Sequence, residues 1–242
     1  MTDSSPNQPK NNKMIARLEN ANKLYKVGDQ TITALNKTSV ELVEGELLLI
    51  IGPSGSGKTT LLSLLGCLIN PTEGKLFIDG QDIGKLSANE MAKVRLDTIG
   101  FVFQQFNLLS PLTAEANVAF PLKMQKLSSS VISQKTSEAL EKVKMSHRKK
   151  NLPKTLSGGE QQRIAIARAL VTNPKIVLCD EPTASLDKDS LVIVMEQLQT
   201  LAKSGKAVAV VTHDPRLTKY ADRAVEVNNG VMKLLDIKNL EH

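Results

Sequence analysis

GPSGSGKTT, residues Gly52 to Thr60, is the stretch that decides the fold. It matches the phosphate-binding pattern G-x-x-x-x-G-K-[ST]. The glycines let backbone N–H groups wrap a phosphate, Lys58 supplies a positive charge, and the Thr59 hydroxyl can ligate Mg²⁺. An apolar strand precedes the loop and an apolar helix follows it, which is the setting that this loop requires. We therefore expect the whole loop to bind nucleotide: Gly52, Pro53, Ser54, Gly55, Ser56, Gly57, Lys58, Thr59 and Thr60.

Strand and helix patterns alternate on both sides of this loop. Apolar runs typical of buried strands lie at residues 47–51, 176–179 and 207–211, and helices are expected over residues 58–68 and 188–203. Such alternation predicts an α/β fold with a mainly parallel sheet. The text from 105 to 156 instead reads as short polar helices broken by Pro111, Pro121 and Pro153, which predicts an inserted helical segment.

Two carboxylates follow one of the predicted strands. Asp180 and Glu181 come directly after the apolar run at residues 176–179. In a chain with this phosphate loop, a strand tip of that form suits a metal-binding carboxylate and a residue that orients or deprotonates water. We therefore expect Asp180 to hold Mg²⁺ and Glu181 to activate the water that attacks the γ-phosphate.

A second candidate anion site is LSGGEQQR, residues Leu156 to Arg163. Ser157, Gly158, Gly159 and Glu160 stand at the start of a predicted helix, where bare N–H groups and the helix dipole favour an anion. One phosphate loop already serves one nucleotide. The simplest hypothesis is a homodimer, in which these residues of one subunit cover the phosphate that the other subunit holds.

Taken together, these motifs resemble the ATP-binding cassette (ABC) ATPases of ABC transporters, over residues 14–232. LSGGE resembles the signature motif of that family. The resemblance implies a P-loop NTPase fold with a mainly parallel sheet core, an N-terminal antiparallel β subdomain and an inserted helical subdomain at roughly residues 105–165. It also implies ATP and Mg²⁺ as cofactors and a dimer that encloses two ATP molecules.

The resemblance supplies further site residues, each from a motif in the family order. Tyr25 matches the aromatic residue that stacks on adenine, and Gln104 in GFVFQQFNLL matches the glutamine that senses metal and water. Asp187 belongs to the Ser185–Asp187 segment that crosses to the other subunit. His213 in VVTHD matches the histidine that contacts the γ-phosphate.

Within the family, the chain resembles the ATPases of the lipoprotein-releasing and macrolide-exporter type. This resemblance rests on the segments LYKVGDQTITALN at 24–36 and GFVFQQFNLLSPLTAEANV at 100–118. One departure is Ala116, where the subgroup usually has Glu before Asn-Val. The resemblance implies a separate integral membrane permease with a large extracytoplasmic domain, and a peripheral position on the cytoplasmic face of the cell membrane. The transported substrate cannot be read from these residues.

Two rival functions stay open, and two others are set aside. The chain could serve an amino-acid-type importer, or a cell-division or regulatory system, since both share every catalytic motif. Non-transport relatives that act on ribosomes or DNA usually carry two cassettes or a long coiled coil, and this chain has neither, so we expect no nucleic-acid partner. A metabolic P-loop kinase is excluded by LSGGE and by the motif around His213.

Composition agrees with a globular domain. The chain has 242 residues, of which 41% are hydrophobic and 23% charged. No apolar run approaches the 18 residues of a membrane-spanning helix. Residues 1–13 are polar, lack the hydrophobic stretch of a secretory signal and are expected to form a disordered tail, which leaves residues 14–242 as the ABC ATPase domain. Cys67 and Cys179 lie in apolar stretches and are expected to be buried thiols.

Overall fold

The structure, a computed structural model, describes residues 13–184 and 188–237. Its strands are β1 (Met14–Val27), β2 (Gln30–Val43), β3 (Leu47–Ile51), β4 (Glu73–Ile78), β5 (Gln81–Asp82), β6 (Ile99–Val102), β7 (Ile176–Asp180), β8 (Ala207–Thr212), β9 (Arg223–Asn228) and β10 (Val231–Leu235). Its α-helices are α1 (Lys58–Leu65), α2 (Ala88–Thr98), α3 (Ala114–Met124), α4 (Ser129–Lys142), α5 (Gly158–Leu170) and α6 (Lys188–Lys203).

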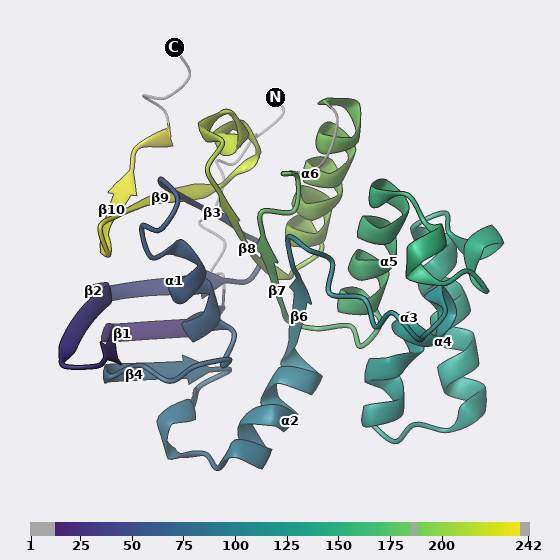
Figure 1. Cartoon of the computed structure of the whole chain (residues 1–242), viewed down its shortest axis with the longest axis horizontal. Coiled ribbons are helices and arrows are strands. Elements are labelled where there is room, and N and C mark those ends of the chain that lie inside the picture. The colour runs from purple at the N-terminus through teal and green to yellow at the C-terminus, as the bar shows by residue number, and fades with distance from the viewer. Residues whose placement is uncertain (1–12, 185–187, 238–242) are drawn as a thin grey trace, which may run out of the picture.

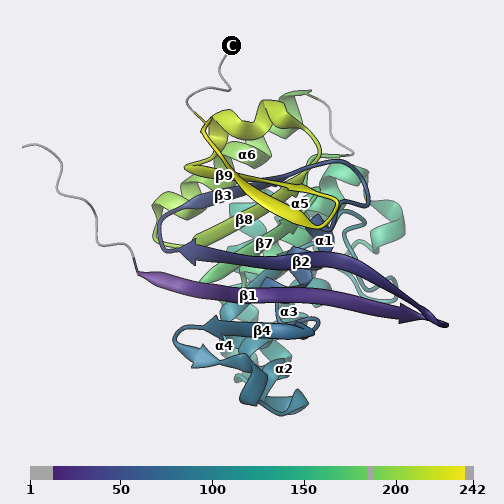
Figure 2. The same cartoon turned by 90° about the vertical axis from the view of Figure 1, so that its left-hand side faces the viewer.

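Two sheets organise these elements. The larger has the order β10-β9-β3-β8-β7-β6, and its strands are parallel except for β10, which pairs antiparallel with β9. The smaller is antiparallel, with the order β2-β1-β4-β5. Figure 1 shows α3, α4 and α5 beside the larger sheet, and Figure 2 shows the smaller sheet face on. The predicted fold class is confirmed: a mainly parallel core, an N-terminal antiparallel part and an inserted group of helices.

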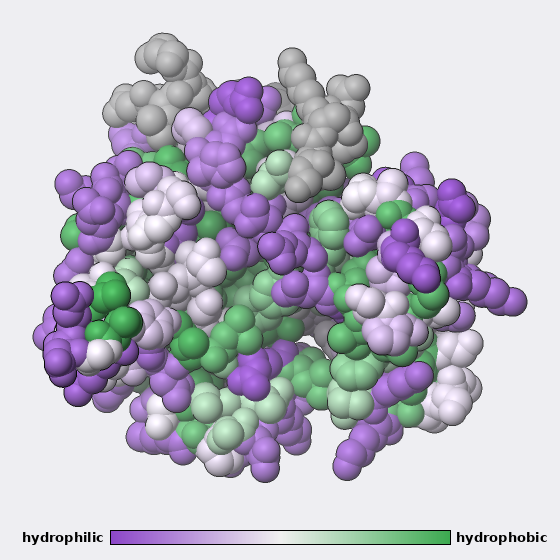
Figure 3. Space-filling view, in the orientation of Figure 1, coloured by the Kyte–Doolittle hydropathy of each residue, from purple (hydrophilic) through white to green (hydrophobic). Residues whose placement is uncertain are grey.

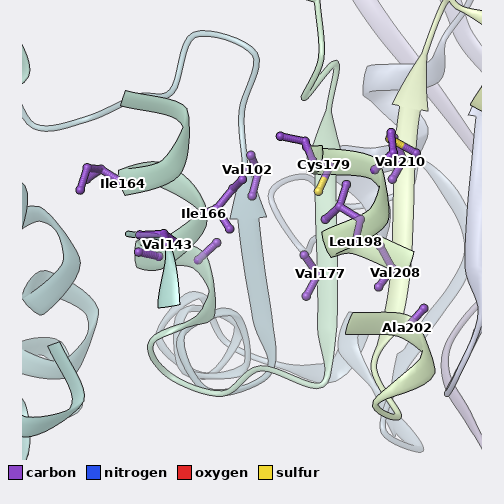
Figure 4. Close-up of a cluster of buried hydrophobic side chains, with 14 of the residues drawn as sticks. Val102, Val143, Ile164, Ile166, Val177, Cys179, Leu198, Ala202, Val208 and Val210 are labelled. Carbon is purple, nitrogen blue, oxygen red and sulfur yellow. The ribbon is translucent and has the colours of Figure 1, made fainter. Parts of the chain in front are cut away.

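Helices cover both faces of the larger sheet. Successive side chains of a strand point to opposite faces, so each strand contributes residues to both sides. On one face, residues from β3, β7 and β8 pack with α5 and α6 in a cluster that includes Leu49, Val102, Ile166, Val177, Cys179, Leu198, Val208 and Val210, part of which Figure 4 shows. On the other face, their neighbours pack with α1 in a cluster that includes Leu48, Ile50, Leu61, Leu64, Leu178 and Ala209. Helices α1 and α5 therefore lie on opposite faces of one sheet.

The sequence expectations for several elements were wrong in detail. Pro121 does not break a helix; it lies inside α3, where its carbonyl accepts a hydrogen bond from the Gln125 amide at 3.1 Å. The fully buried Val118 and Leu122 hold this helix in the core, and such packing outweighs the missing donor of one proline. Helix α1 ends at Leu65, before residue 68, because Cys67 takes a left-handed φ of 54°.

The strands at both ends of the chain also differ from the sequence expectation. Strands β1 and β2 are 14 residues long each, whereas the turn signals between residues 14 and 51 predict short strands. Strand β6 ends at Val102, whereas the apolar run predicts a strand over residues 99–104, and β9 and β10 were not predicted. In the part of the chain that the structure describes, no helix combines the length and the apolar character needed to cross a membrane.

Candidate functional site

The loop between β3 and α1 has the backbone shape of an anion cradle. Gly52, Gly55 and Gly57 all have positive φ, at 151°, 74° and 108°, a conformation that side-chain-bearing residues rarely adopt. Gly57 is the N-cap of α1 and brings no side chain to its first amides. The first turn of α1 therefore offers free N–H groups and the positive end of its dipole to a ligand.

Lys58 lies at the centre of this cradle. Its Nζ donates to the backbone carbonyls of Gly52 at 2.8 Å and Pro53 at 2.7 Å. Burial lowers the pKa of the Lys58 ammonium, while the nearby carboxylates of Glu181 and Asp180 partly oppose this shift. The ammonium is thus held among loop carbonyls that a phosphate oxygen could replace as its acceptor.

Thr59 and Asp180 come from distant parts of the chain and meet beside the cradle. The Thr59 hydroxyl lies 3.5 and 3.4 Å from the two Asp180 carboxylate oxygens. Burial raises the pKa of Asp180, and the neighbouring Glu181 charge adds to the shift. A hydroxyl and a carboxylate are the hard oxygen donors that Mg²⁺ prefers beside substrate phosphates, so this pair fits the expected metal.

Glu181 and His213 form a second pair at the same edge of the sheet. Glu181 follows β7, His213 follows β8, and these strands are neighbours. The Glu181 amide donates to the Val211 carbonyl at 2.9 Å, and Glu181 Oε1 lies 2.9 Å from His213 Nδ1. Glu181 has a φ of 48°, unusual for a residue with a side chain, and such conformations concentrate at functional sites.

Gln104 and Tyr25 lie at the borders of this site. Gln104 is exposed two residues beyond β6, which pairs with β7 up to Val102 and Cys179, so it follows the same sheet edge as Asp180. Tyr25 is 40% exposed on β1 and pairs with Ile32 of β2. Ala34 lies two residues beyond Ile32 on β2 and contacts the cradle, since a Cβ on Gly57 would lie 2.4 Å from the Ala34 carbonyl oxygen.

The second predicted anion site has the expected helix start. Ser157 is the N-cap of α5 and accepts from the Glu160 amide, and the Glu160 carboxylate accepts from the Ser157 amide at 2.8 Å, a capping box. Glu160 also pairs with Arg148 at 3.0 Å. Gly158 is exposed, has no positive φ, and a Cβ there would meet nothing within 4 Å. The fold of one chain therefore does not require this glycine.

The structure does not bring the two anion sites together on one face. Lys58 begins α1 and Gly158 begins α5, and these helices pack on opposite faces of the larger sheet. The predicted site residue Asp187 lies outside the described residues.

Two polar residues of α5 were missed from the sequence. The buried Gln162 amide donates to the Pro182 carbonyl at 3.0 Å, next to Glu181. Arg168 donates to the carbonyls of Phe106 at 2.7 Å and Asn107 at 2.6 Å, just beyond Gln104. Gln162 occupies the helix position expected for an apolar residue, four before Ile166, and that polar interruption was the available signal.

Comparison with known proteins supports the same reading. The family model described as ABC transporter matches residues 35–184. The ABC transporter ATP-binding protein MJ0796 of Methanocaldococcus jannaschii is 43% identical over 88% of this chain and 93% of its own length. The macrolide export ATP-binding/permease protein MacB of Campylobacter fetus is 42% identical over 88% of this chain, which spans only 33% of that longer protein.

Solved structures agree with this match. The dimeric post-hydrolysis state of the cassette MJ0796, bound to ADP and Pi, superposes with a TM-score of 0.85 at 40% identity, covering 92% of this chain and 99% of that one. CbiO1 of Clostridium perfringens, part of an ABC transporter complex, gives a TM-score of 0.82 at 29% identity and covers 94% of this chain. The predicted resemblance to the macrolide-exporter type is confirmed by the match to the macrolide export protein MacB. The chain belongs to the ABC transporter family and is one of its ATP-binding, ATP-hydrolysing proteins.

Proposed function

We propose that two copies of this chain enclose two Mg²⁺–ATP complexes and that the dimer drives a separate membrane permease. The observation that carries the proposal is the pair of half-sites on opposite faces of the sheet. The cradle at Lys58 can grip a triphosphate, and the start of α5 presents Ser157 and an unobstructed Gly158 away from it. A second copy supplies the missing half of each site, as the dimeric relatives suggest.

The residues of the cradle bind and orient the substrate. The free amides of α1 and the loop wrap the phosphates, and Lys58 exchanges its two carbonyl acceptors for phosphate oxygens. Tyr25 offers a ring near the cradle on which adenine can stack. Thr59 and Asp180 would hold Mg²⁺, whose charge would offset that of the phosphates, and Gln104 follows the same edge of the sheet.

Glu181 and His213 act on the attacking water. The Glu181 carboxylate accepts a proton from the water or orients it toward the γ-phosphate, and His213 holds the carboxylate from the neighbouring strand. The Ser157 hydroxyl and the glycine amides of the second copy stabilise the charge on the γ-phosphate. The free energy of ATP binding thus stabilises the dimer, and hydrolysis of ATP removes that stabilisation.

The experiment that tests the enclosure uses Glu181→Gln. The amide keeps the shape of the side chain and cannot accept the proton, so ATP should bind without turnover and the dimer should accumulate. Sedimentation at saturating ATP and Mg²⁺ should show a dimer for this variant and a monomer for Glu181→Gln carrying Lys58→Ala as well. A monomer for both variants would overturn the proposed dimer.

A groove beside the site is the surface that we propose for the permease. A cavity of about 1400 Å³ lies between α2, β6, α3 and α5, with apolar side chains that include Leu96, Phe101, Phe103, Phe120 and Met124. Figure 3 shows hydrophobic residues facing the hollow between the part with α2 and the part with α3. Arg168 also lines the groove and donates hydrogen bonds to the segment that follows Gln104. A permease segment bound in the groove would therefore contact a residue that is connected to the segment bearing Gln104.

The charge distribution supports a partner at this side of the molecule. Residues 114–155 contain nine Lys and Arg and three Asp and Glu, a net charge of +6 that equals the net charge of the whole chain. The remainder of the chain is therefore neutral overall. A locally basic surface suits an acidic partner segment or the anionic cytoplasmic face of the cell membrane, where we place the complex.

The permease proposal is tested by co-purification from membranes. The expected partner is an integral membrane protein with a large extracytoplasmic domain, of the kind used in macrolide export or lipoprotein release. Substituting Phe120→Asp and Met124→Asp in the groove should release it, while ATP binding by the isolated chain stays unchanged. Recovery of an importer permease with a substrate-binding protein would refute the export assignment.

A further inference from the structure

The phosphate cradle leans on backbone from two distant parts of the chain. A Cβ on Gly52 would lie 2.0 Å from the Val227 carbonyl oxygen of β9, and one on Gly57 would lie 2.4 Å from the Ala34 carbonyl oxygen of β2. These contacts leave no room for a side chain at either position. The two glycines are therefore needed for close packing against β9 and β2 as well as for their positive φ.

The turn between β9 and β10 completes this support. Asn229 and Gly230 have φ values of 48° and 74°, the signature of a type I′ hairpin turn. The Gly230 amide donates to the Ser56 carbonyl of the cradle at 2.8 Å, and the Gly230 carbonyl accepts from the Asn36 amide at 2.8 Å. The Asn36 side chain also donates to the Asn229 carbonyl at 3.3 Å. Strand β2 thus holds the turn, and the turn holds the cradle.

The bond to Ser56 has a directional consequence. In a trans peptide, the carbonyl and the N–H of the same unit point in opposite directions. When the Gly230 amide fixes the Ser56 carbonyl, it also fixes the direction of the Gly57 N–H, which belongs to the same peptide unit. Ser56 is only 3% exposed, so the anchored peptide has little freedom to rotate. The turn therefore orients a donor at the start of α1 before any phosphate arrives.

We propose that the Asn229–Gly230 turn is part of the nucleotide site, with Gly230 and Asn36 as positioning residues for the phosphate cradle. The turn lies beyond residues 35–184, the segment that the family model covers. In strand order, β9 and β10 form the end of the larger sheet next to β3, from which the cradle begins, and Figure 2 shows this hairpin beside β2. Loosening the turn lets the cradle amides disperse, so each nucleotide must first reorder them.

The experiment compares two glycine substitutions in turns of the same kind. Gly230→Ala places a Cβ 3.1 Å from the Asn36 side-chain nitrogen and 3.3 Å from the Leu35 Cα, so the turn or its neighbours on β2 must give way slightly. Gly80→Ala is the matched control: Gly80 has a φ of 81°, follows Asp79 at 48°, and its Cβ would meet nothing within 4 Å. Both substitutions carry the same backbone strain, and only the first disturbs the cradle.

Binding of ATP and of ADP to the full chain is measured by calorimetric titration with Mg²⁺, and hydrolysis gives KM and kcat. Gly230→Ala should weaken the binding of both nucleotides by about fivefold to tenfold, the effect of one lost hydrogen bond, and raise KM more than it lowers kcat. Gly80→Ala should bind as the wild type does. Equal weakening in both variants, or unchanged binding in Gly230→Ala, would overturn the proposal.

A second variant covers the case in which Gly230→Ala does not fold. Asn36→Ala removes the exposed side chain that donates to the Asn229 carbonyl and adds no charge beside the cradle. It should weaken ATP binding about twofold to threefold without changing the melting temperature by more than about 2 °C. Wild-type affinity in Asn36→Ala would contradict the positioning role of Asn36.

Discussion

Gly158→Ala should make the protein more stable and less active at the same time. Gly158 is the first residue of α5, has no positive φ, and has open space where a Cβ would point. Replacing glycine by alanine at such a position stabilises a fold by about 0.4–1 kcal/mol, because the unfolded chain loses freedom. For a chain of this size, that corresponds to a rise of about 1–4 °C in melting temperature.

Activity should move in the opposite direction, because in the proposed dimer a second copy and its nucleotide occupy the open space beside Gly158. A methyl group there keeps the N–H donors away from the γ-phosphate, and we expect hydrolysis to fall at least about tenfold, the loss of about 1.4 kcal/mol. The assay pairs thermal unfolding without nucleotide with steady-state ATP hydrolysis and with sedimentation in ATP.

Gly84→Ala is the control, since Gly84 also lacks a positive φ, lies in a helical turn away from the site and has its nearest neighbour 3.4 Å from a Cβ. It should leave hydrolysis unchanged. Wild-type hydrolysis by a folded Gly158→Ala protein would refute the argument, because it would show that nothing approaches this glycine during turnover.

Two further outcomes are expected. Lys58→Ala should weaken ATP binding about 10-fold to 100-fold, because a charged donor to the phosphates is lost, and unchanged affinity in a titration would refute the cradle. Burial raises the pKa of the Cys67 thiol to about 11, so the native thiol should resist alkylation at pH 8 and react only after unfolding. Since the folded pKa lies above the ordinary value of about 8.5, the contribution of Cys67 to stability is fully present below pH 8.5 and lost as pH rises toward 11, which denaturant titrations across that range can follow. Rapid labelling of the native Cys67 would contradict this.

Local motifs were enough to predict that several candidate site residues lie at one edge of the sheet. Asp180, Glu181 and His213 each follow an apolar run, and parallel strands bring their carboxyl ends to one edge, so the contacts between Thr59 and Asp180 and between Glu181 and His213 follow from strand order. The predicted helix start at Ser157 is also present, and the structure adds a capping box between Ser157 and Glu160 that was not predicted.

Contacts that depend on tertiary packing could not be read in this way. Arg168 looks like any exposed helix residue in the sequence, and its acceptors at Phe106 and Asn107 exist only because two left-handed residues turn their carbonyls toward it. Pro121 misled the helix boundary because burial of its neighbours outweighs local propensity. The Asn229–Gly230 turn is a clear hairpin signal, but its bond to Ser56 spans more than 170 residues of chain.

The separation of α1 and α5 onto opposite faces of one sheet has a genetic consequence. A variant with Lys58 substituted keeps Ser157 intact, and a variant with Ser157 substituted keeps Lys58 intact. In the proposed dimer, a mixed pair made in one cell has one site built from two intact half-sites and one site built from two altered half-sites. Two alleles that are each inactive alone should therefore complement each other. An allele that carries both substitutions should complement neither.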